Sequence, residues 1–407
     1  SDPTDKGIER QWHQAVLPVQ ETLALPGSMQ EQGYGNAPGP STPWTGDIRQ
    51  EEWQKPKYDP YRSADNFKMP FWLQPDRYYK GAAWYQRTVT IPDSWQGKQI
   101  TLTLERPHWE TRVWVNSQEA GSARYLSAAH TYDLSPHLTP GKHTLTVRVD
   151  NRMIVNVGPN SHSVSDHTQS NWNGIVGRIE LKAEPAARIE EVQVYPDLEK
   201  KAIRVVTHIA ARGEKDLSEA LTYEVFFNDR KVGANQEPGI QLTSSGTIQE
   251  VLFSIREPIQ IWDEFNPNLY TLKTRLQTEA GIHEKTTTFG MRRIELDGNR
   301  IVLNGRPAFL RGTLECCIFP KTGYPPTDVE AWRRIIRICK SHGLNHIRFH
   351  SWCPPEAAFI AADELGFYYQ VECSSWANQG ASVGNGTPLD AWLYDEADAV
   401  LKAYGNH

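Results

Sequence analysis

The chain has 407 residues, of which 39 % are hydrophobic and 23 % charged, values typical of a soluble globular protein with two to four domains. Its formal net charge of -6 is small for this length, so composition favours neither a nucleic-acid partner nor a membrane surface. No apolar run reaches the length of a membrane span, and the start, SDPTDKGIERQW, is too polar for a signal peptide. We therefore expect a cytoplasmic protein, or a periplasmic or extracellular one whose signal peptide has been removed.

The first part of the chain, residues 1–185, predicts an antiparallel β-sandwich. Its opening is rich in Pro, Gly and Gln and predicts irregular structure to about Asp76. Short runs with period-two alternation then follow, separated by turn signals such as DSWQG and LTPGK. These runs are AAWYQRTVTIP, KQITLTLE, TRVWVNSQEAG, HTLTVRVDN and GRIELKAE. The segment 151–173 interrupts this rhythm with many polar and aromatic residues, which is typical of a functional loop.

Residues 186–289 predict a second β-sandwich of about the size of an immunoglobulin-like domain. Its expected strands are IEEVQVYPDL, AIRVVTHIAAR, LTYEVFFNDRK, QEVLFSI and LYTLKTRLQTEAG.

From residue 290 the pattern changes to alternating strands and helices. Strands are predicted at RPAFLRGTLE, NHIRFH and FYYQVECSSW. Helices are predicted at TDVEAWRRIIRICKSHG, with Thr327 as N-cap and Gly343 as its stop, at PPEAAFIAADELG, ending at Gly366, and at PLDAWLYDEADAVLKAYGNH. Near-continuous apolar strands that alternate with helices predict a parallel sheet.

For two groups of residues in this last part, the sequence favours a structural interpretation over a functional one. The basic cluster on the first helix favours a solvated face over an anion site, and the odd number of cysteines without a CxxC pair favours buried thiols over disulfides or zinc. The residues concerned are Arg333, Arg334 and Arg337, and Cys316, Cys317, Cys339, Cys353 and Cys373.

Polar and aromatic residues follow the second and third strands directly. Arg348, His350 and Trp352 end one apolar run, and Glu372 and Trp376 end the next. Because α/β barrels build active sites at the carboxyl ends of their strands, this placement indicates the wall of a site.

Several segments, in the same order, resemble glycoside hydrolase family 2, the clan of β-galactosidase, β-glucuronidase and β-mannosidase. The first sandwich resembles its sugar-binding jelly roll through GAAWYQRTVTIP, TRVWVNSQEAG, HTYDLSPHL, GKHTLTVRVDN and WNGIVGRIEL. The second resembles its immunoglobulin-like domain through IWDEFNPNLYTLKTRL. The last part resembles its (β/α)₈ barrel through FGMRRIELDGNRIVLNGRPAFLRGT and HGLNHIRFHSWCPPEAAFIAADELGFYYQVE.

The resemblance implies a jelly-roll sugar-binding domain at 1–185, an immunoglobulin-like β-sandwich at 186–289, and the first three βα units of a TIM barrel at 290–407. It implies a retaining exo-glycosidase, β-galactosidase-like, that hydrolyses terminal non-reducing sugars. The family's acid/base and nucleophile glutamates follow the fourth and seventh barrel strands, so both are expected beyond His407. We expect no catalytic residue within this chain, and no activity from it alone.

The resemblance also implies sugar contacts in two places. One is the jelly-roll loop, with Trp172 and Gly174 as its structural part, and the other is the pair of strand ends. Glu372 and Arg348 could equally form a buried ion pair, His350 lies one place earlier than the family's histidine and could be structural, and the tryptophans could be packing residues. The loop could instead cap a domain interface. The expected contacts are Asp166, His167, Gln169, Asn171, Arg348, His350, Trp352, Glu372 and Trp376.

A carbohydrate is the only partner that we expect, with no nucleic acid and no membrane, although a homo-oligomer is compatible with the sequence. The family needs no organic cofactor. A divalent or sodium ion is compatible with it, but no ligand set in the sequence requires one. The alternative function is a non-catalytic carbohydrate-binding or interaction module that keeps the two sandwiches.

Overall fold

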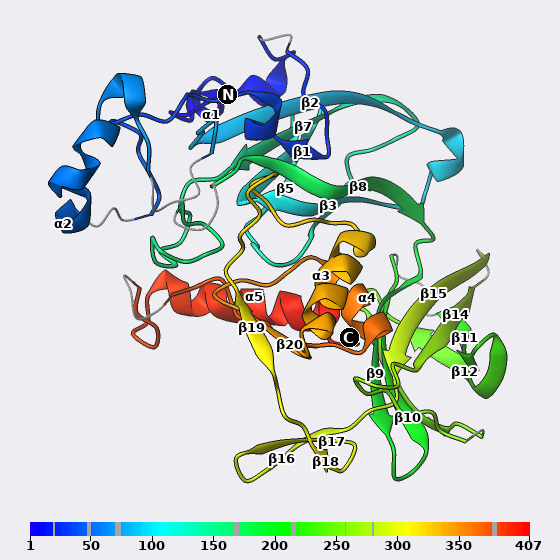
Figure 1. Ribbon diagram of the computed structural model, residues 1–407. Helices are drawn as coiled ribbons and strands as arrows, with labels where there is room; N and C mark the ends of the chain where they lie inside the picture. The colour runs from blue at the N-terminus through cyan, green and yellow to red at the C-terminus, as the bar shows by residue number, and fades with distance from the viewer. Residues whose placement is uncertain are drawn as a thin grey trace.

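The computed structural model describes residues 1–18, 21–46, 50–69, 75–166, 171–212, 217–256, 258–278, 281–376 and 381–407. Within these ranges no helix combines the length and apolar composition that crossing a bilayer requires. The chain forms two β-sandwiches followed by a small parallel sheet with helices (Figure 1).

Among its described residues, the N-terminal segment to about Asp76 contains only short elements, in line with its predicted irregular structure. It is joined to the first sandwich by a hydrogen bond from the Asp2 backbone N–H to the Ala82 carbonyl, at 2.7 Å. The elements are α1 (Lys6–Glu9), η1 (Trp12–Gln14), β1 (Gly27–Ser28), η2 (Gln30–Gln32), α2 (Gln50–Trp53), η3 (Pro56–Tyr61) and η4 (Ala64–Asn66).

Two antiparallel four-stranded sheets form the first sandwich, with strand orders β1–β8–β3–β6 and β2–β7–β4–β5. The period-two alternation directs one row of apolar side chains from each sheet into a shared core that includes Leu102, Val113 and Val147. The strands are β2 (Ala82–Ile91), β3 (Gln99–His108), β4 (Glu110–Val115), β5 (Gln118–Ala123), β6 (His130–Asp133), β7 (Gly141–Asp150) and β8 (Gly174–Glu184), with η5 (Asp93–Trp95) between β2 and β3.

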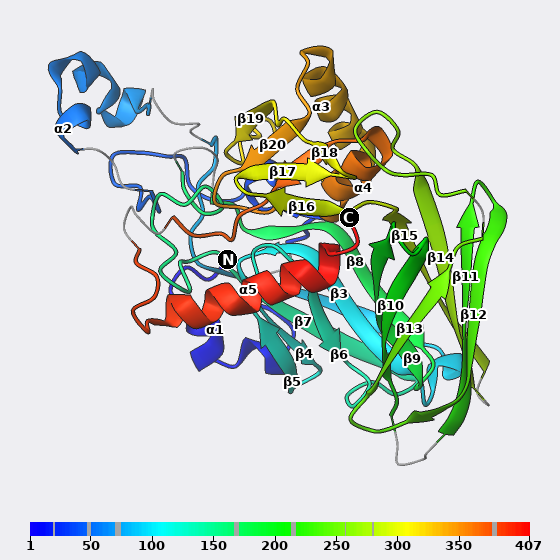
Figure 2. The same ribbon diagram turned by 90° about the horizontal axis from the view of Figure 1, so that it is seen from below.

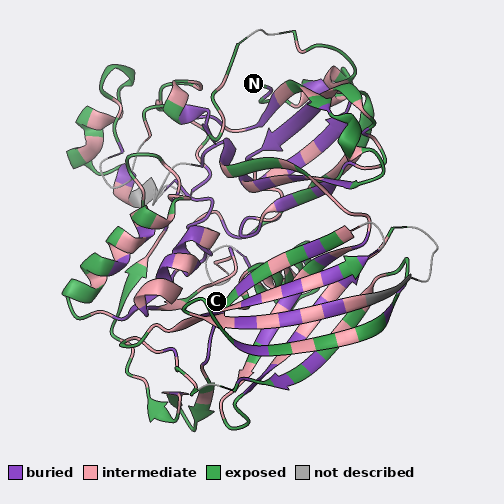
Figure 3. Ribbon diagram, turned by 90° about the vertical axis from the view of Figure 1, so that its right-hand side faces the viewer, coloured by how far each residue is buried: buried purple, intermediate pink, exposed green. Residues whose placement is uncertain are grey.

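The second sandwich packs a three-stranded sheet, β13–β10–β9, against a four-stranded sheet, β12–β11–β14–β15. Its core joins residues of both sheets, such as Val205 and Leu272, and Figure 3 shows buried and exposed residues alternating along these strands. The strands are β9 (Arg188–Asp197), β10 (Ala202–Ala210), β11 (Leu217–Phe227), β12 (Arg230–Leu242), β13 (Thr247–Ser254), β14 (Leu269–Thr278) and β15 (Gly281–Gly290).

The last part contains a short antiparallel sheet, β16–β17–β18, and then a parallel sheet, β19–β20–β21. The chain order β19, α3, β20, α4, β21, α5 is the one that the sequence predicts. The third strand is shorter than FYYQVECSSW predicts, because only Tyr368–Gln370 finds backbone partners on β20. The elements are β16 (Ile294–Asp297), β17 (Arg300–Leu303), β18 (Arg306–Pro307), β19 (Gly312–Glu315), α3 (Val329–Ser341), β20 (His346–Phe349), α4 (Glu356–Leu365), β21 (Tyr368–Gln370) and α5 (Pro388–Tyr404).

Helix α3 begins one residue later than the sequence analysis predicts. The N-cap is Asp328 and not Thr327, because the Asp328 carboxylate accepts a hydrogen bond from the Ala331 backbone N–H at 2.8 Å. The two helix stops are confirmed: Gly343 and Gly366 have φ of +75° and +64°, a backbone conformation that glycine adopts without a Cβ clash.

Helix α5 packs against the first sandwich (Figure 2). The Trp392 indole N–H donates to the Arg124 carbonyl at 3.0 Å, and its ring lies edge-on to Trp109 at 5.6 Å between centroids. This helix therefore ties the parallel-sheet part to the first sandwich.

Candidate functional site

An ion pair joins the ends of β20 and β21. Arg348 places Nε and Nη2 each 2.6 Å from Glu372 Oε1, while Glu372 Oε2 accepts from the Ser351 backbone N–H at 2.8 Å. The Arg348 side chain remains 43 % exposed and that of Glu372 25 %. Both carboxylate oxygens therefore accept hydrogen bonds, whereas the Arg348 side chain stays partly exposed.

Three rings lie together at the same end of the sheet. The centroid of His350 lies 4.5 Å from that of His162 and 4.9 Å from that of Trp376, and His162 and Trp376 are 5.1 Å apart. Trp376 is anchored by its backbone N–H, which donates to the Val157 carbonyl at 2.9 Å. The segment 151–173 thus reaches the strand ends, through His162 and Val157.

Hydrogen bonding assigns the tautomers of the two histidines. His162 Nδ1 lies 3.1 Å from the His350 carbonyl oxygen, which only accepts, so His162 Nδ1 carries the proton. His350 Nδ1, 3.0 Å away, then accepts from the same N–H group, and His350 carries its own proton on Nε2.

Trp352 points into the core rather than toward these rings. It is 1 % exposed, its indole N–H donates to the Glu315 carbonyl at 3.1 Å, and its ring packs edge-on against Phe349 at 5.0 Å. A substrate contact by this side chain would require the core to open, and it stays a prediction without a supporting contact.

Glu315, at the end of β19, is a third strand-end carboxylate. Its oxygens accept from the backbone N–H groups of Cys317 at 2.8 Å and Ile318 at 2.9 Å, and burial raises the pKa of its carboxyl. It closes the turn after β19 in the manner of a capping side chain.

The predicted contacts Asp166 and Asn171, in the loop 151–173 of the first sandwich, bond to the segment at Thr45 and not to the strand ends. Asp166 is fully buried, and its Oδ2 accepts from the backbone N–H groups of Thr45 at 2.5 Å and Gly46 at 3.1 Å. Burial raises the pKa of Asp166 to about 6, against the lowering effect of the Gly46 and Thr45 N–H groups. Asn171, also buried, donates to Thr45 Oγ1 at 3.0 Å and to the Asn151 carbonyl at 2.8 Å.

Asp166 and Asn171 thus hold the segment at Thr45 to the loop. In each side chain Oδ1 is buried without a hydrogen-bond partner among the described residues. His167 and Gln169 lie outside the described residues, and sugar contact by any of the four stays a prediction.

The structure therefore brings four of the nine expected residues together: Arg348, His350, Glu372 and Trp376. We call these four, with His162 and Ser351, the strand-end cluster. Sequence reasoning missed His162, which is one polar residue among many in a long loop, and Glu315, for which the available signal was a carboxylate at the end of the predicted strand RPAFLRGTLE.

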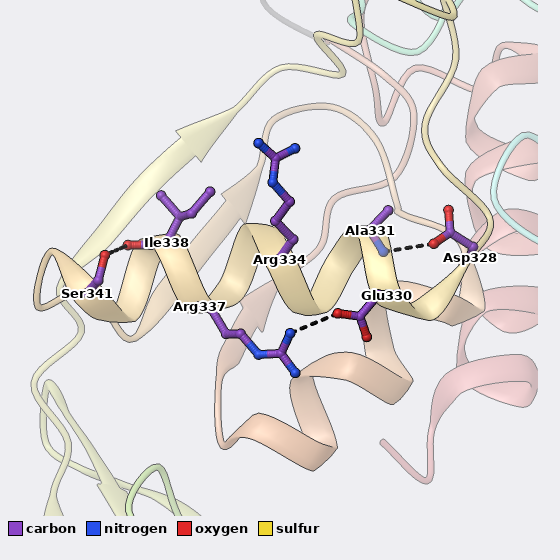
Figure 4. A pocket seen from close by; sticks show the side chains of 7 residues that line it. All are labelled: Asp328, Glu330, Ala331, Arg334, Arg337, Ile338 and Ser341. Carbon is purple, nitrogen blue, oxygen red and sulfur yellow. Dashed lines mark hydrogen bonds and ion pairs between the residues drawn. The ribbon is translucent and has the colours of Figure 1, made fainter.

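A separate hollow of about 490 Å³ lies along α3, and none of its lining residues belongs to the strand-end cluster (Figure 4). Its lining residues all come from this one helix and its N-cap, and Arg337 in it pairs with Glu330 at 2.8 Å. Arg333 likewise pairs with Glu364 at 2.7 Å. Two of the three arginines are therefore satisfied by carboxylates. The lining residues are Asp328, Glu330, Ala331, Arg334, Arg337, Ile338 and Ser341.

Among the described residues, no group of three or more His, Cys, Asp or Glu side chains is arranged to hold a metal ion. The chemistry that the strand-end cluster offers is hydrogen bonding from a guanidinium and imidazoles beside an indole ring. That combination suits a polyhydroxylated ring with apolar C–H faces.

Comparison with known proteins gives two family matches. Residues 46–185 match the model described as the sugar binding domain of glycosyl hydrolases family 2, and residues 187–292 match that described as glycosyl hydrolases family 2. The two matches together cover more than half of the chain.

Individual relatives are distant and longer. The β-galactosidase large subunit of Latilactobacillus sakei is 22 % identical over 403 residues, which are 95 % of this chain and 61 % of that protein. A putative β-glucuronidase of Formosa agariphila is 25 % identical over 343 residues, 80 % of this chain and 31 % of that protein. The solved β-glucuronidase from Ruminococcus gnavus, in complex with D-glucaro-d-lactam, is 18 % identical with a TM-score of 0.69, and the match covers 100 % of this chain and 63 % of that one. The chain thus spans less than two thirds of each of these proteins.

Proposed function

We propose, on the premise that this chain belongs to glycosyl hydrolases family 2, that it forms the N-terminal portion of a retaining exo-glycosidase that removes terminal non-reducing sugars. We take its activity to be like that of a β-galactosidase, which the similarity to the Latilactobacillus sakei protein supports. Residues 290–407 would be the first three βα units of a (β/α)₈ barrel, which the parallel order β19–β20–β21 supports.

The strand-end cluster is the observation that carries this proposal. Arg348 and Glu372 lie at the carboxyl ends of parallel strands, where barrels of this kind bind their substrates. The partly exposed guanidinium of Arg348 would donate to sugar hydroxyls, and the Trp376 ring would border the sugar. These residues bind and orient the sugar.

The bond-breaking step needs two carboxylates about 5–5.5 Å apart, one as nucleophile and one as acid/base. Glu315 ends β19 and Glu372 follows β21, the first and third of these strands, whereas the family's catalytic glutamates follow the fourth and seventh barrel strands. We therefore assign neither residue to that pair. The two catalytic glutamates would come from segments beyond His407.

The test compares the 407-residue chain with the longest natural product of its gene on nitrophenyl β-galactoside and β-glucuronide. We expect turnover from the longer protein alone, and a loss of kcat/KM on the order of tenfold to a hundredfold in its Arg348→Ala variant, since a hydrogen bond from a charged group contributes about 1.5–3 kcal/mol. Arg334→Ala, on the outer face of α3, is the matched control and should leave kcat/KM unchanged. Turnover by the 407-residue chain that Glu372→Gln abolishes would contradict our assignment of the catalytic pair.

A non-catalytic carbohydrate-binding module is the second candidate. The observation that favours it is that the strand-end cluster would supply hydrogen-bonding groups for a sugar, while Glu372 and Glu315 both hold protein donors. A longer product that binds galactose or glucuronate, loses binding on Arg348→Ala and shows no turnover would support the module over the enzyme.

A further inference from the structure

His162, in the loop 151–173 of the first sandwich, makes two hydrogen bonds to the turn after β20. Its backbone N–H donates to Ser351 Oγ at 2.9 Å, and its Nδ1–H points at the His350 carbonyl at 3.1 Å. Ser351 is 1 % exposed and His162 8 % exposed, so water does not compete readily for these bonds. The residues are 189 and 188 positions apart in the chain, so the contact joins the sandwich to the strand ends.

Ser351 has an unusual backbone. Its φ is +53°, the left-handed region that a residue with a Cβ avoids unless its surroundings hold it there. Two contacts of Ser351 can hold it: the hydroxyl oxygen accepts from His162, and the backbone N–H donates to Glu372 Oε2 at 2.8 Å. One residue therefore links the sandwich loop to the carboxylate.

The same carboxylate holds Arg348, the arginine that the proposed function assigns to the sugar. Glu372 uses Oε2 for Ser351 and Oε1 for Arg348, so its two oxygens connect the turn to the guanidinium. The connected path runs His162, Ser351, Glu372, Arg348, with each link between 2.6 and 2.9 Å.

We propose that Ser351 is a positioning residue through which the first sandwich sets the orientation of the Glu372–Arg348 pair toward the sugar. The sandwich would then contribute to the site indirectly, through the His162 N–H, as well as by any direct contact. The positioning path itself is independent of turnover, but its role in sugar binding rests on the proposed function.

Two substitutions separate the hydrogen bond from the backbone conformation. Ser351→Gly removes the acceptor Oγ and tolerates φ of +53°, whereas Ser351→Ala removes the same oxygen and keeps the Cβ. Ser375→Ala is the matched control, since its Oγ is buried three residues after Glu372 and has no hydrogen-bond partner among the described residues.

The first measurement follows the Arg348 Nε–H signal of the 407-residue chain by ¹H–¹⁵N NMR, assigned with Arg348→Lys. We expect the signal to move in Ser351→Gly and in Ser351→Ala and to stay in place in Ser375→Ala. An unmoved signal in Ser351→Gly would overturn the proposal, whether or not the longer protein is a glycosidase.

The second measurement is steady-state kinetics of the longer product. Loss of one supporting hydrogen bond should raise KM about threefold to tenfold in Ser351→Gly, with kcat changed less than about twofold. If the NMR signal moves while KM stays at the wild-type value, the path exists but does not serve sugar binding, and the proposal fails. If wild type shows no turnover on any glycoside, the proposed function fails. The NMR result alone then decides whether Ser351 positions the Glu372–Arg348 pair.

Discussion

Glu396 is a buried carboxylate that the strand-end cluster does not use. It lies on α5 with no exposed surface, and its Oε1 accepts from the Leu126 backbone N–H of the first sandwich. Burial raises the pKa of this carboxyl to about 7, although hydrogen bonds from the Leu126 N–H and from Ser127, and the positive charge of Arg106, act in the opposite direction.

This raised pKa predicts a pH-dependent stability. Between the ordinary carboxyl pKa of about 4.5 and the folded-state value of about 7, the folded state binds more protons than the unfolded state. The free energy of unfolding should therefore fall as pH rises through this window, by at most about 3 kcal/mol from this group. Tm measured from pH 4.5 to 8 should fall less steeply in Glu396→Gln than in wild type.

The control for this prediction is Asp395→Asn, which alters the exposed neighbour of Glu396 on the same helix. Its pH profile should follow that of wild type. Parallel profiles for Glu396→Gln and wild type would mean that Glu396 keeps its charge on folding, and would contradict the prediction.

At the scale of elements, the start of α3 depends on one side chain. Because Asp328 caps the Ala331 N–H, Asp328→Ala should destabilise the helix by about 1 kcal/mol, whereas Thr327→Ala should have little effect. Thermal or denaturant unfolding of the two variants checks this. A larger loss of stability from Thr327→Ala than from Asp328→Ala would show that Thr327 is the N-cap, as the sequence alone predicts.

The docking of α5 depends on Trp392. This side chain is fully buried between the helix and the first sandwich, and Trp392→Ala should cost about 3–5 kcal/mol through lost burial and a cavity. Hydrogen exchange should quicken at Leu126, whose N–H binds Glu396 on the same helix.

Tyr394 provides the comparison, because it lies on α5 with 80 % of its surface exposed. Tyr394→Ala should leave both Tm and the exchange of Leu126 unchanged. Equal effects of the two substitutions would show that helix propensity, and not docking, holds α5 in place.

At the scale of the whole molecule, several apolar side chains of the β16–β19 segment are exposed. Ile294, Leu296, Phe309 and Leu314 are 62 %, 76 %, 76 % and 52 % exposed. Within the described residues, β19 and β21 each pair only with β20, so the outer edges of both are unpaired. Exposed apolar patches and open strand edges both favour association.

We therefore expect the 407-residue chain to self-associate in light scattering. Leu296→Ser together with Phe309→Ser should reduce the apparent mass, whereas Phe265→Ser, at a 79 % exposed position of the second sandwich, should not. A monodisperse monomer for wild type would refute this expectation.

Much of the architecture follows from sequence because its causes are local. Period-two alternation identifies most strands of the two sandwiches, although β12 and β15 of the second are not among the predicted strands. Proline and glycine at helix ends mark α4 and the stop of α3. The sequence predicts that Arg348 and Glu372 lie close together, because neighbouring parallel strands end at the same edge of a sheet. The structure confirms this proximity. The resemblance of several motifs, in the same order, to glycoside hydrolase family 2 likewise predicts the family, which the two family matches confirm.

Only the tertiary structure decides the features that depend on distant segments. An aromatic residue after a strand can face a site or the core, and Trp352 turns inward because Phe349 and the Glu315 carbonyl offer it a packed, hydrogen-bonded place. Asp166 is buried because Thr45 and Gly46, about 120 residues earlier, supply N–H groups to it. The partnership of His162 with Ser351 has the same cause: no local pattern encodes a hydrogen bond across 189 residues, and only the packing of the first sandwich against the strand ends creates it.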